Sequence, residues 1–476
     1  MKKLFVIFTE DQWLTAVTFG ALAFSLILVT TLNLNLAFFS LIVFSSLGIF
    51  RKSFHYGLSF FLVVILVFPS VNIIDNLIAT RELFVLILFI IGISSLILDK
   101  YKFKMLPVFY YGFALIVLYI VVIIFFRDES ITSSIFISTG MLAITGFVYL
   151  VLIILFKHFF QTTRRLERLF LVIVAAGTIQ VIIGLVFKNN VYGVLKIFQL
   201  GQTYWVIILS ITIPITLGAY LIQKDSLSTI SNLWFRNKGR NIYKVVDTVL
   251  TKNNFPKEAK KVVINLKKTK INIQRMLIFS LALQILGLIT TSSYILLITI
   301  SIGIFIIGVL MRDKKIILGA LGGLIVSMGV FSEFRPSLVI QLKQITLDII
   351  LSIKNAHNWS FFWRGFIDSK EQLAKSTYLF IFNKLGLIGF IIFSLGLIQY
   401  FREIRFAYLK SEEFERIWLI VILSIFVEFL FLGIFSNVFF IGPASLLFWI
   451  LYGVLQNLKN RKREYQLLGT NLVLNK

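Results

Sequence analysis

The chain alternates long apolar stretches with short polar ones over almost its whole length. A helix needs roughly 20 apolar residues to cross the hydrocarbon core of a bilayer. We therefore predict an all-α polytopic membrane protein with about 14 transmembrane helices, and 12–14 if short stretches near 35–50 or 276–311 are re-entrant. The predicted spans are 13–32, 35–50, 57–74, 83–98, 107–126, 135–156, 169–187, 204–223, 276–290, 294–311, 315–331, 376–400, 417–435 and 437–455.

The charges between these spans predict the orientation of the chain. Lysine and arginine collect in the cytoplasmic loops of membrane proteins. Strongly basic loops, such as KHFFQTTRRLER at 157–168 and RDKK at 312–315, alternate with net acidic ones, such as DNLIATRE at 75–82 and RDESITSS at 127–134. This alternation places both termini in the cytoplasm and 332–375 outside.

Two polar segments are longer than the rest. Residues 224–275 hold thirteen lysines and arginines against three acidic residues. They predict a basic cytoplasmic loop of one or two amphipathic helices that lie on anionic headgroups, with docking of a partner as the alternative. The other segment, 332–375, is an external loop in which 341–354 has the apolar spacing of an amphipathic helix. We expect 1–475 to form a single integral membrane domain.

Composition narrows the class of protein further. The chain is 58% hydrophobic with a mean hydropathy of +0.92, which excludes a soluble globular protein. A net charge of +25 would favour nucleic acid in a soluble chain, but basic cytoplasmic loops account for it here and no nucleic-acid partner is expected.

The chain has no P-loop, no HExxH and no cysteine, so no metal site is expected. The spans are nearly free of acidic residues, which argues against an ion-driven transporter, and Glu428 is interpreted as a helix-packing residue.

The external loop carries cations on the side where the charge rule disfavours them. Such cations predict an anionic ligand, and near a bilayer a lipid-linked phosphate or pyrophosphate fits, with ordinary lipid headgroups as the alternative. The six cations are Arg335, Lys343, Lys354, Arg364, Lys370 and Lys375.

Several short stretches between 170 and 455 follow one another in the order of a known family, the O-antigen polymerase and ligase superfamily. The chain resembles that superfamily at Ile179–Leu185, Gly201–Trp205, Ile213–Ile215, Thr290–Tyr294, Lys343, Phe362–Phe366, Ala374–Leu379 and Leu385–Gly389. Two departures are informative. The family arginine is missing from Thr290–Tyr294, and Lys375 stands where ligases of the family carry a histidine. The second departure favours a polymerase over a ligase.

The resemblance implies metal-independent glycosyl transfer, without a cofactor, at the outer face of the bacterial cytoplasmic membrane. The growing glycan would move from undecaprenyl pyrophosphate onto a new lipid-linked repeat unit of O-antigen, capsule or exopolysaccharide. Partners would be the lipid-linked oligosaccharides, membrane lipids, a flippase and a chain-length regulator. A lipid-linked-oligosaccharide flippase and a non-catalytic scaffold remain alternative functions.

Under this resemblance, the site residues have two roles. Cations stabilise the pyrophosphate as it leaves, and a base accepts the proton of the acceptor hydroxyl. For the leaving group we predict Arg335 and Arg364 as catalytic residues. The candidates for the base are Glu333, His357 and Asp368. Further cations expected to bind the pyrophosphate are Lys343, Lys370, Lys375, Arg127 and Lys188.

Overall fold

The computed structural model describes a set of helices and leaves other parts of the chain undescribed. The described residues are 54–67, 72–74, 78–79, 106–125, 149–161, 163–187, 202–235, 257–290, 294–327, 347, 376–411, 413–436, 438–439 and 444–459. The predicted spans at 13–32, 35–50 and 83–98 lie outside these residues, as does the predicted amphipathic helix at 341–354 apart from Leu347.

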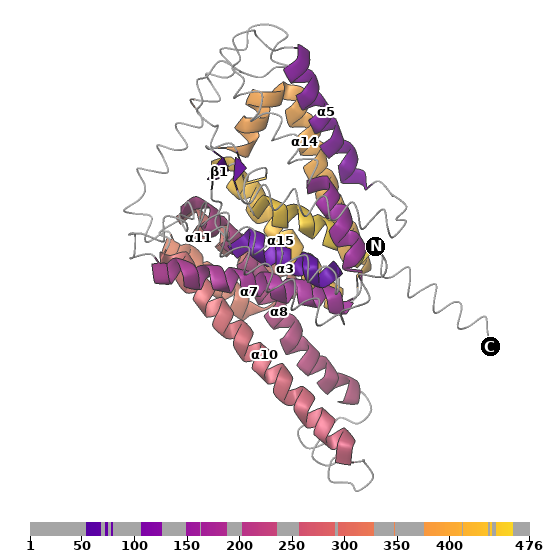
Figure 1. The fold of residues 1–476 in the computed structure, drawn as a ribbon. Helices are drawn as coiled ribbons and strands as arrows, with labels where there is room; N and C mark the ends of the chain where they lie inside the picture. Colours follow the sequence, from indigo (N-terminus) through magenta and orange to yellow (C-terminus); the bar gives the residue numbers. More distant parts are fainter. Residues whose placement is uncertain are drawn as a thin grey trace, which may run out of the picture.

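The described part is helical apart from one short antiparallel ribbon, β1 (Asn72–Ile74) with β2 (Ile78–Ala79). The labelled helices in Figure 1 are α3 (Phe54–Val67), α5 (Pro107–Phe125), α7 (Thr163–Phe187), α8 (Gln202–Phe235), α10 (Lys257–Thr290), α11 (Tyr294–Met311), α14 (Thr377–Lys410) and α15 (Glu413–Phe435). Three further helical runs cover 149–159, 314–327 and 444–459.

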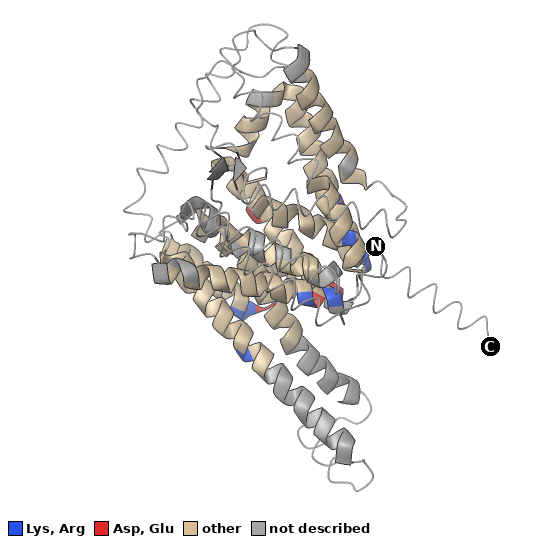
Figure 2. Ribbon diagram, in the orientation of Figure 1, with Lys and Arg blue, Asp and Glu red and all other residues tan. Residues whose placement is uncertain are grey.

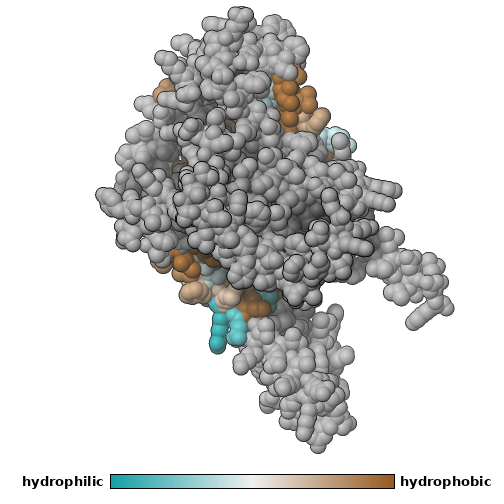
Figure 3. Space-filling model, viewed as in Figure 1, coloured by the Kyte–Doolittle hydropathy of each residue, from teal (hydrophilic) through white to brown (hydrophobic). Residues whose placement is uncertain are grey.

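The helices have the length and surface of membrane helices. Among the described residues, Asn272–Thr290, Leu385–Lys410 and Glu415–Phe435 are long and apolar enough to cross a bilayer. On α10 the exposed side chains change from Asn272 and Arg275 to Met276, Ile278 and Phe279, and Figure 3 shows teal giving way to brown along this helix. An apolar exposed face is stable against lipid tails and not against water. The coarse prediction of a helical membrane protein is confirmed, whereas the span count and the orientation stay predictions.

Some predicted spans match the helices closely, and the reason is local sequence. Helix α11 has the predicted bounds, 294–311. It ends at Arg312, whose φ is 54°, and the Asp313 carboxylate then accepts a hydrogen bond from the Lys315 N–H at 2.9 Å as the next helix begins. Helix α5 starts on Pro107, at a first-turn position where a missing N–H costs nothing.

Other predicted bounds are wrong. The predicted span 57–74 ends early, since α3 stops at Val67 near Pro69 and 72–74 form a strand. The last described helix runs over 444–459, directly after Pro443, instead of 437–455. Helix α7 begins at Thr163, within the predicted loop 157–168.

Where the structure describes the basic segment 224–275, its residues belong to the same helices as the neighbouring predicted spans. Helices α8 and α10 each have 34 residues, about 51 Å at 1.5 Å per residue. That length exceeds a hydrocarbon core of about 30 Å. Residues 224–235 and 257–275 therefore continue the two predicted spans, and Figure 1 shows α8 and α10 extending together away from the other helices.

Helix α7 packs against α3, α8 and α10, and α15 packs against α8, α11 and α14. Glycine allows close approach at several of these contacts, as is common between membrane helices. A Cβ at Gly177 of α7 would lie 2.6 Å from the Thr212 side chain of α8. A Cβ at Gly218 of α8 would lie 2.5 Å from Val421 of α15. Because these backbones are so close, α8 is held between α7 and α15.

The predicted cytoplasmic segments meet at one end of the helices. The Asn457 side-chain amide donates to the carbonyls of Phe156, at 3.4 Å, and Phe160, at 3.1 Å. Lys459 forms an ion pair with Glu403 of α14. Figure 2 shows the charged residues of the described part gathered mainly near helix ends. Segments that the sequence assigns to one side of the membrane thus lie together.

A polar network joins α7, α8 and α10 within this apolar packing. Gln284 of α10 is fully buried, and its Nε2 donates to Thr178 Oγ1 of α7 at 3.3 Å. The Thr216 hydroxyl of α8 has one hydrogen, which it shares between the Thr212 carbonyl at 2.7 Å and Gln284 Oε1 at 3.0 Å. The network fixes the register of α7, α8 and α10 relative to one another.

We expect the change Gln284→Leu to lower the free energy of unfolding by about 1 kcal/mol, because interhelical hydrogen bonds in membranes contribute roughly 0.6 kcal/mol each. The loss stays small because Thr178 and Thr216 still donate to carbonyls of their own helices. Thermal or denaturant unfolding in lipid nanodiscs measures the loss. In a Thr178→Val background the same change should cost less, and an equal cost there would contradict the network.

Candidate functional site at the start of α14

The ten predicted site residues all lie outside the described residues. They are Arg127, Lys188, Glu333, Arg335, Lys343, His357, Arg364, Asp368, Lys370 and Lys375. The structure does describe the chain immediately after Lys375, where the predicted external loop enters α14. This entry point is the candidate functional site, because its geometry fixes where the loop returns to the membrane.

Three side chains fasten the start of α14 to the end of α15. The Ser376 hydroxyl donates to the Gly433 carbonyl at 3.1 Å, and the Thr377 hydroxyl donates to the Ser436 carbonyl at 2.8 Å. The Tyr378 hydroxyl donates to the Leu430 carbonyl at 2.8 Å. Gly433 is among the last four residues of α15, whose carbonyls lack partners within the helix, so its carbonyl is available to accept such a bond. These bonds therefore hold Ser376, the first described residue after the predicted external loop, at the end of α15.

Helix α14 is broken about two turns after this anchor. Gly386 has φ 63° and ψ −166°, a backbone conformation that is essentially restricted to glycine. Figure 1 shows the ribbon of α14 changing direction between a short first part and a long second part beside α5. A Cβ at Gly389 would overlap the Leu385 side chain, so the turn is also too tight for a larger residue there. The predicted span 376–400 thus corresponds to a helix that starts at Thr377, breaks at Gly386 and continues to Lys410.

Aromatic rings pack the two parts of α14 together. The Tyr378 ring lies 6.5 Å from the rings of both Phe390 and Phe393, and the Phe382 ring lies 6.4 Å from that of Phe390. All three contacts are edge-to-face, the arrangement that aromatic pairs favour. Phe393 also contacts Phe439, 5.4 Å away, beyond the end of α15. The first part of α14 thus packs against its second part and against the segment that follows α15.

The described side chains at the start of α14 serve to position the chain. The hydroxyls of Ser376, Thr377 and Tyr378 are committed to backbone carbonyls, so they hold the chain and supply no base. The described residues contain no group of three or more histidine or acidic side chains that could hold a metal ion. Broken helices in membrane proteins occur where they are buried in protein or line a cavity.

No family model, curated protein or solved structure matches the chain.

Sequence reasoning noticed part of this site and missed the rest. The stretch Leu385–Gly389 drew notice for its resemblance to a family motif, but no local signal indicated that Gly386 breaks the helix. Hydropathy contains no information on the backbone angle φ, and glycine is common in membrane helices. The anchoring residues Ser376 and Thr377 were missed because their acceptors lie more than fifty residues away in the chain.

Glu428 on α15 is a second polar position that the sequence singled out. Its side chain is fully buried, its Oε1 accepts a hydrogen bond from the Ser424 hydroxyl at 3.1 Å, and its Oε2 has no hydrogen-bond partner. The carboxylate lies directly against Gly303 of α11. This contact agrees with the interpretation of Glu428 as a residue of helix packing.

Proposed function

We propose that this protein is a polymerase of lipid-linked oligosaccharide repeat units, acting at the outer face of a bacterial cytoplasmic membrane. The observation that carries the proposal is the set of six cations in 332–375, on the side of the membrane where the charge pattern disfavours them. The start of α14 supports it, because Ser376 and Thr377, which follow that loop in the sequence, are bound to the end of α15.

The reaction needs an anion site and a base. The acceptor hydroxyl of the new repeat unit attacks the anomeric carbon of the growing glycan and forms the new glycosidic bond. The bond from that carbon to undecaprenyl pyrophosphate breaks, and the hydroxyl proton passes to a base such as Glu333, His357 or Asp368. Arg335 and Arg364 stabilise the departing pyrophosphate, with support from Lys343, Lys370, Lys375, Arg127 and Lys188.

The flippase alternative would require cations along a central cavity to accompany a pyrophosphate through the membrane. Among the described residues, the buried charged side chains are Glu403 and Glu428, and both are acidic. The described spans therefore give more support to a polymerase than to a flippase. Lys375, in place of a family histidine, supports a polymerase over a ligase.

The test is the pair of changes Arg335→Ala and Arg364→Ala in cells that make the polymer. Removal of one group that stabilises a developing anion lowers a rate about 100-fold or more. We expect surface glycan to shift from long chains to single repeat units, measured by gel electrophoresis of surface polysaccharide at matched protein levels. Arg402→Ala is the control, because Arg402 is exposed near the opposite end of α14.

Other outcomes identify the alternatives. Loss of all surface repeat units, including single ones, would indicate a flippase. Long polymer that accumulates on the lipid carrier would indicate a ligase. An unchanged pattern at normal protein level would contradict any catalytic role for these arginines and would favour a scaffold.

A further inference from the structure

The exposed face of α14 changes from apolar to cationic toward the end of the helix. Its exposed positions recur at alternating steps of four and three residues, so they form one stripe along the helix surface. In chain order they are Ile391, Leu395, Ile398, Arg402, Arg405 and Leu409. The stripe therefore joins three aliphatic positions to a pair of arginines.

Both arginines of the stripe have free hydrogen-bond donors. Among the described residues, neither the Arg402 nor the Arg405 guanidinium forms a hydrogen bond, an ion pair or a contact with an aromatic ring. Each guanidinium has five N–H donors in a planar fork that matches the oxygens of a phosphate. Residues three apart on a helix are neighbours on its surface. The two groups can therefore bind one phosphate together.

The negative charge within this part of α14 is already compensated. The acidic residue of 401–410 is Glu403, which is buried, accepts a hydrogen bond from Gln399 at 3.1 Å and forms an ion pair with Lys459. Lys410 adds a further exposed cation, with its Nζ 3.8 Å from the centre of the Phe406 ring. The stripe thus presents positive charge that Glu403 does not balance.

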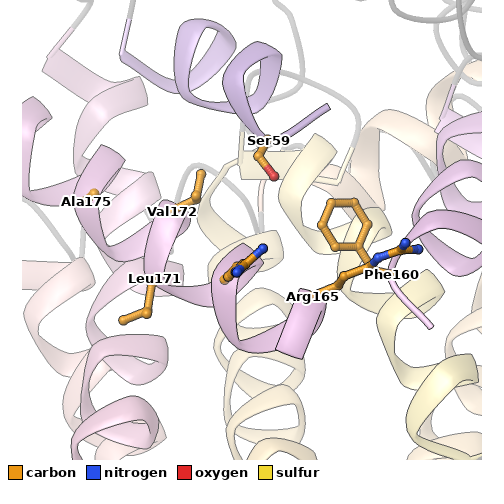
Figure 4. A pocket seen from close by; sticks show the side chains of 7 residues that line it. Ser59, Phe160, Arg165, Leu171, Val172 and Ala175 are labelled. Carbon is orange, nitrogen blue, oxygen red and sulfur yellow. The ribbon is translucent and has the colours of Figure 1, made fainter. Parts of the chain in front are cut away.

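The arginine beside the cavity between α3 and α7 is in a different state. This cavity has a volume of about 290 Å³, and Figure 4 shows Ser59, Phe160 and Arg165 around it. The Arg165 guanidinium donates to the Phe159 carbonyl at 3.2 Å. Arg165, Arg168 and Ser59 also have further interactions within the protein. These groups hold the protein together, whereas Arg402 and Arg405 are available to a ligand.

The stripe has the dimensions of one leaflet of a bilayer. The apolar segment that can cross a membrane begins at Leu385. Arg402 and Arg405 follow it by about 26 and 30 Å at 1.5 Å per residue, at the far boundary of a hydrocarbon core of about 30 Å. From Arg402 back to Ile391 the helix rises about 16 Å, close to half of that core. An acyl chain of the same leaflet thus has the length of the aliphatic part.

We infer that this stripe binds an anionic phospholipid, with its phosphate at Arg402 and Arg405 and an acyl chain along Ile398, Leu395 and Ile391. A second copy of the chain would bring like charges together, which opposes pairing. A soluble acidic partner could reach the arginines but not the aliphatic positions within the bilayer. The inference does not depend on the proposed polymerase function, since the arginines lie at the other end of α14 from Ser376.

The test uses the full chain, purified in detergent and titrated with phosphatidylglycerol, phosphatidylcholine or glycerol phosphate. Native mass spectrometry counts the bound lipid and gives its affinity. We expect phosphatidylglycerol to bind in preference to phosphatidylcholine, and glycerol phosphate at the same concentration not to displace it. Arg402→Gln with Arg405→Gln should weaken phosphatidylglycerol binding by about tenfold or more, since each cation near an anionic lipid contributes roughly a factor of five.

The matched control is Lys314→Gln with Lys315→Gln, which removes two exposed cations on the same predicted side of the membrane, next to Asp313. This control should keep the affinity for phosphatidylglycerol. A second variant, Arg402→Lys with Arg405→Lys, keeps the charge and should keep the preference for phosphatidylglycerol, which separates loss of charge from loss of folding.

Three results would overturn the inference. The first is an equal loss in the Lys314 and Lys315 control or equal binding of the two lipids, because either would show that the stripe does not select the lipid. The second is displacement by glycerol phosphate, which would identify the ligand as a soluble phosphate. The third is a change from dimer to monomer in the arginine variant without loss of lipid, which would make the stripe an interface between copies of the chain.

Discussion

Replacement of Gly386 by alanine is expected to destabilise the protein by about 1–3 kcal/mol and, under the proposed polymerase function, to shorten the surface polymer. Gly386 has φ 63° and ψ −166° at the break in α14, and a side chain is strained in that conformation. The strain is relieved only if the first part of α14 moves. Such a movement would disturb the bonds of Ser376 and Thr377 to the end of α15.

Unfolding temperature in nanodiscs measures the first effect, and the length distribution of the polymer measures the second. The matched controls are Gly319→Ala and Gly322→Ala in the helix 314–327, because nothing lies within 4 Å of a Cβ at either position. Alanine favours a helix over glycine by roughly 0.5–1 kcal/mol, so these controls should keep or slightly raise stability. If Gly386→Ala behaved as the controls do, the break in α14 would not be required for folding or function.

The change Gly303→Ala is expected to lower the free energy of unfolding by about 1–3 kcal/mol through overpacking. A Cβ at Gly303 would overlap Glu428 Oε1 and would lie 2.5 Å from Glu428 Cδ and 2.7 Å from the Ser424 hydroxyl. Both partners are fully buried, so neither can turn out to solvent. The new methyl group must therefore push α11 and α15 apart or displace the carboxyl group.

A double-mutant cycle tests whether the atoms of Glu428 cause this loss. Glu428→Ala removes the atoms that the new Cβ would meet, so Gly303→Ala should cost much less in that background, with a coupling of about 0.5–3 kcal/mol. Glu428→Gln keeps the shape of the side chain and should not rescue Gly303→Ala. Rescue by glutamine would contradict a steric conflict, and an absence of coupling with alanine would contradict the contact between the two helices.

Hydropathy determined the class of fold and many of its helices. The bounds of α11 and the end of α15 at Phe435 follow from the length of apolar runs between polar turns. The exposed change from Arg275 to Met276 falls at the predicted start of a span. These features depend on the local balance between lipid and water, which composition records directly. The ten site residues in the loops were also chosen from sequence alone, and their roles stay predictions.

Only the tertiary structure decided how the helices end, bend and meet. Nothing in LGLIGF indicates that Gly386 breaks α14, because the break is held by rings and carbonyls from distant parts of the chain. The cavity between α3 and α7 is likewise lined both by Arg165 and by Ser59, which lies more than a hundred residues earlier in the chain. Hydrophobic periodicity says that a residue lies in a membrane helix, whereas packing between distant segments decides what that residue contacts.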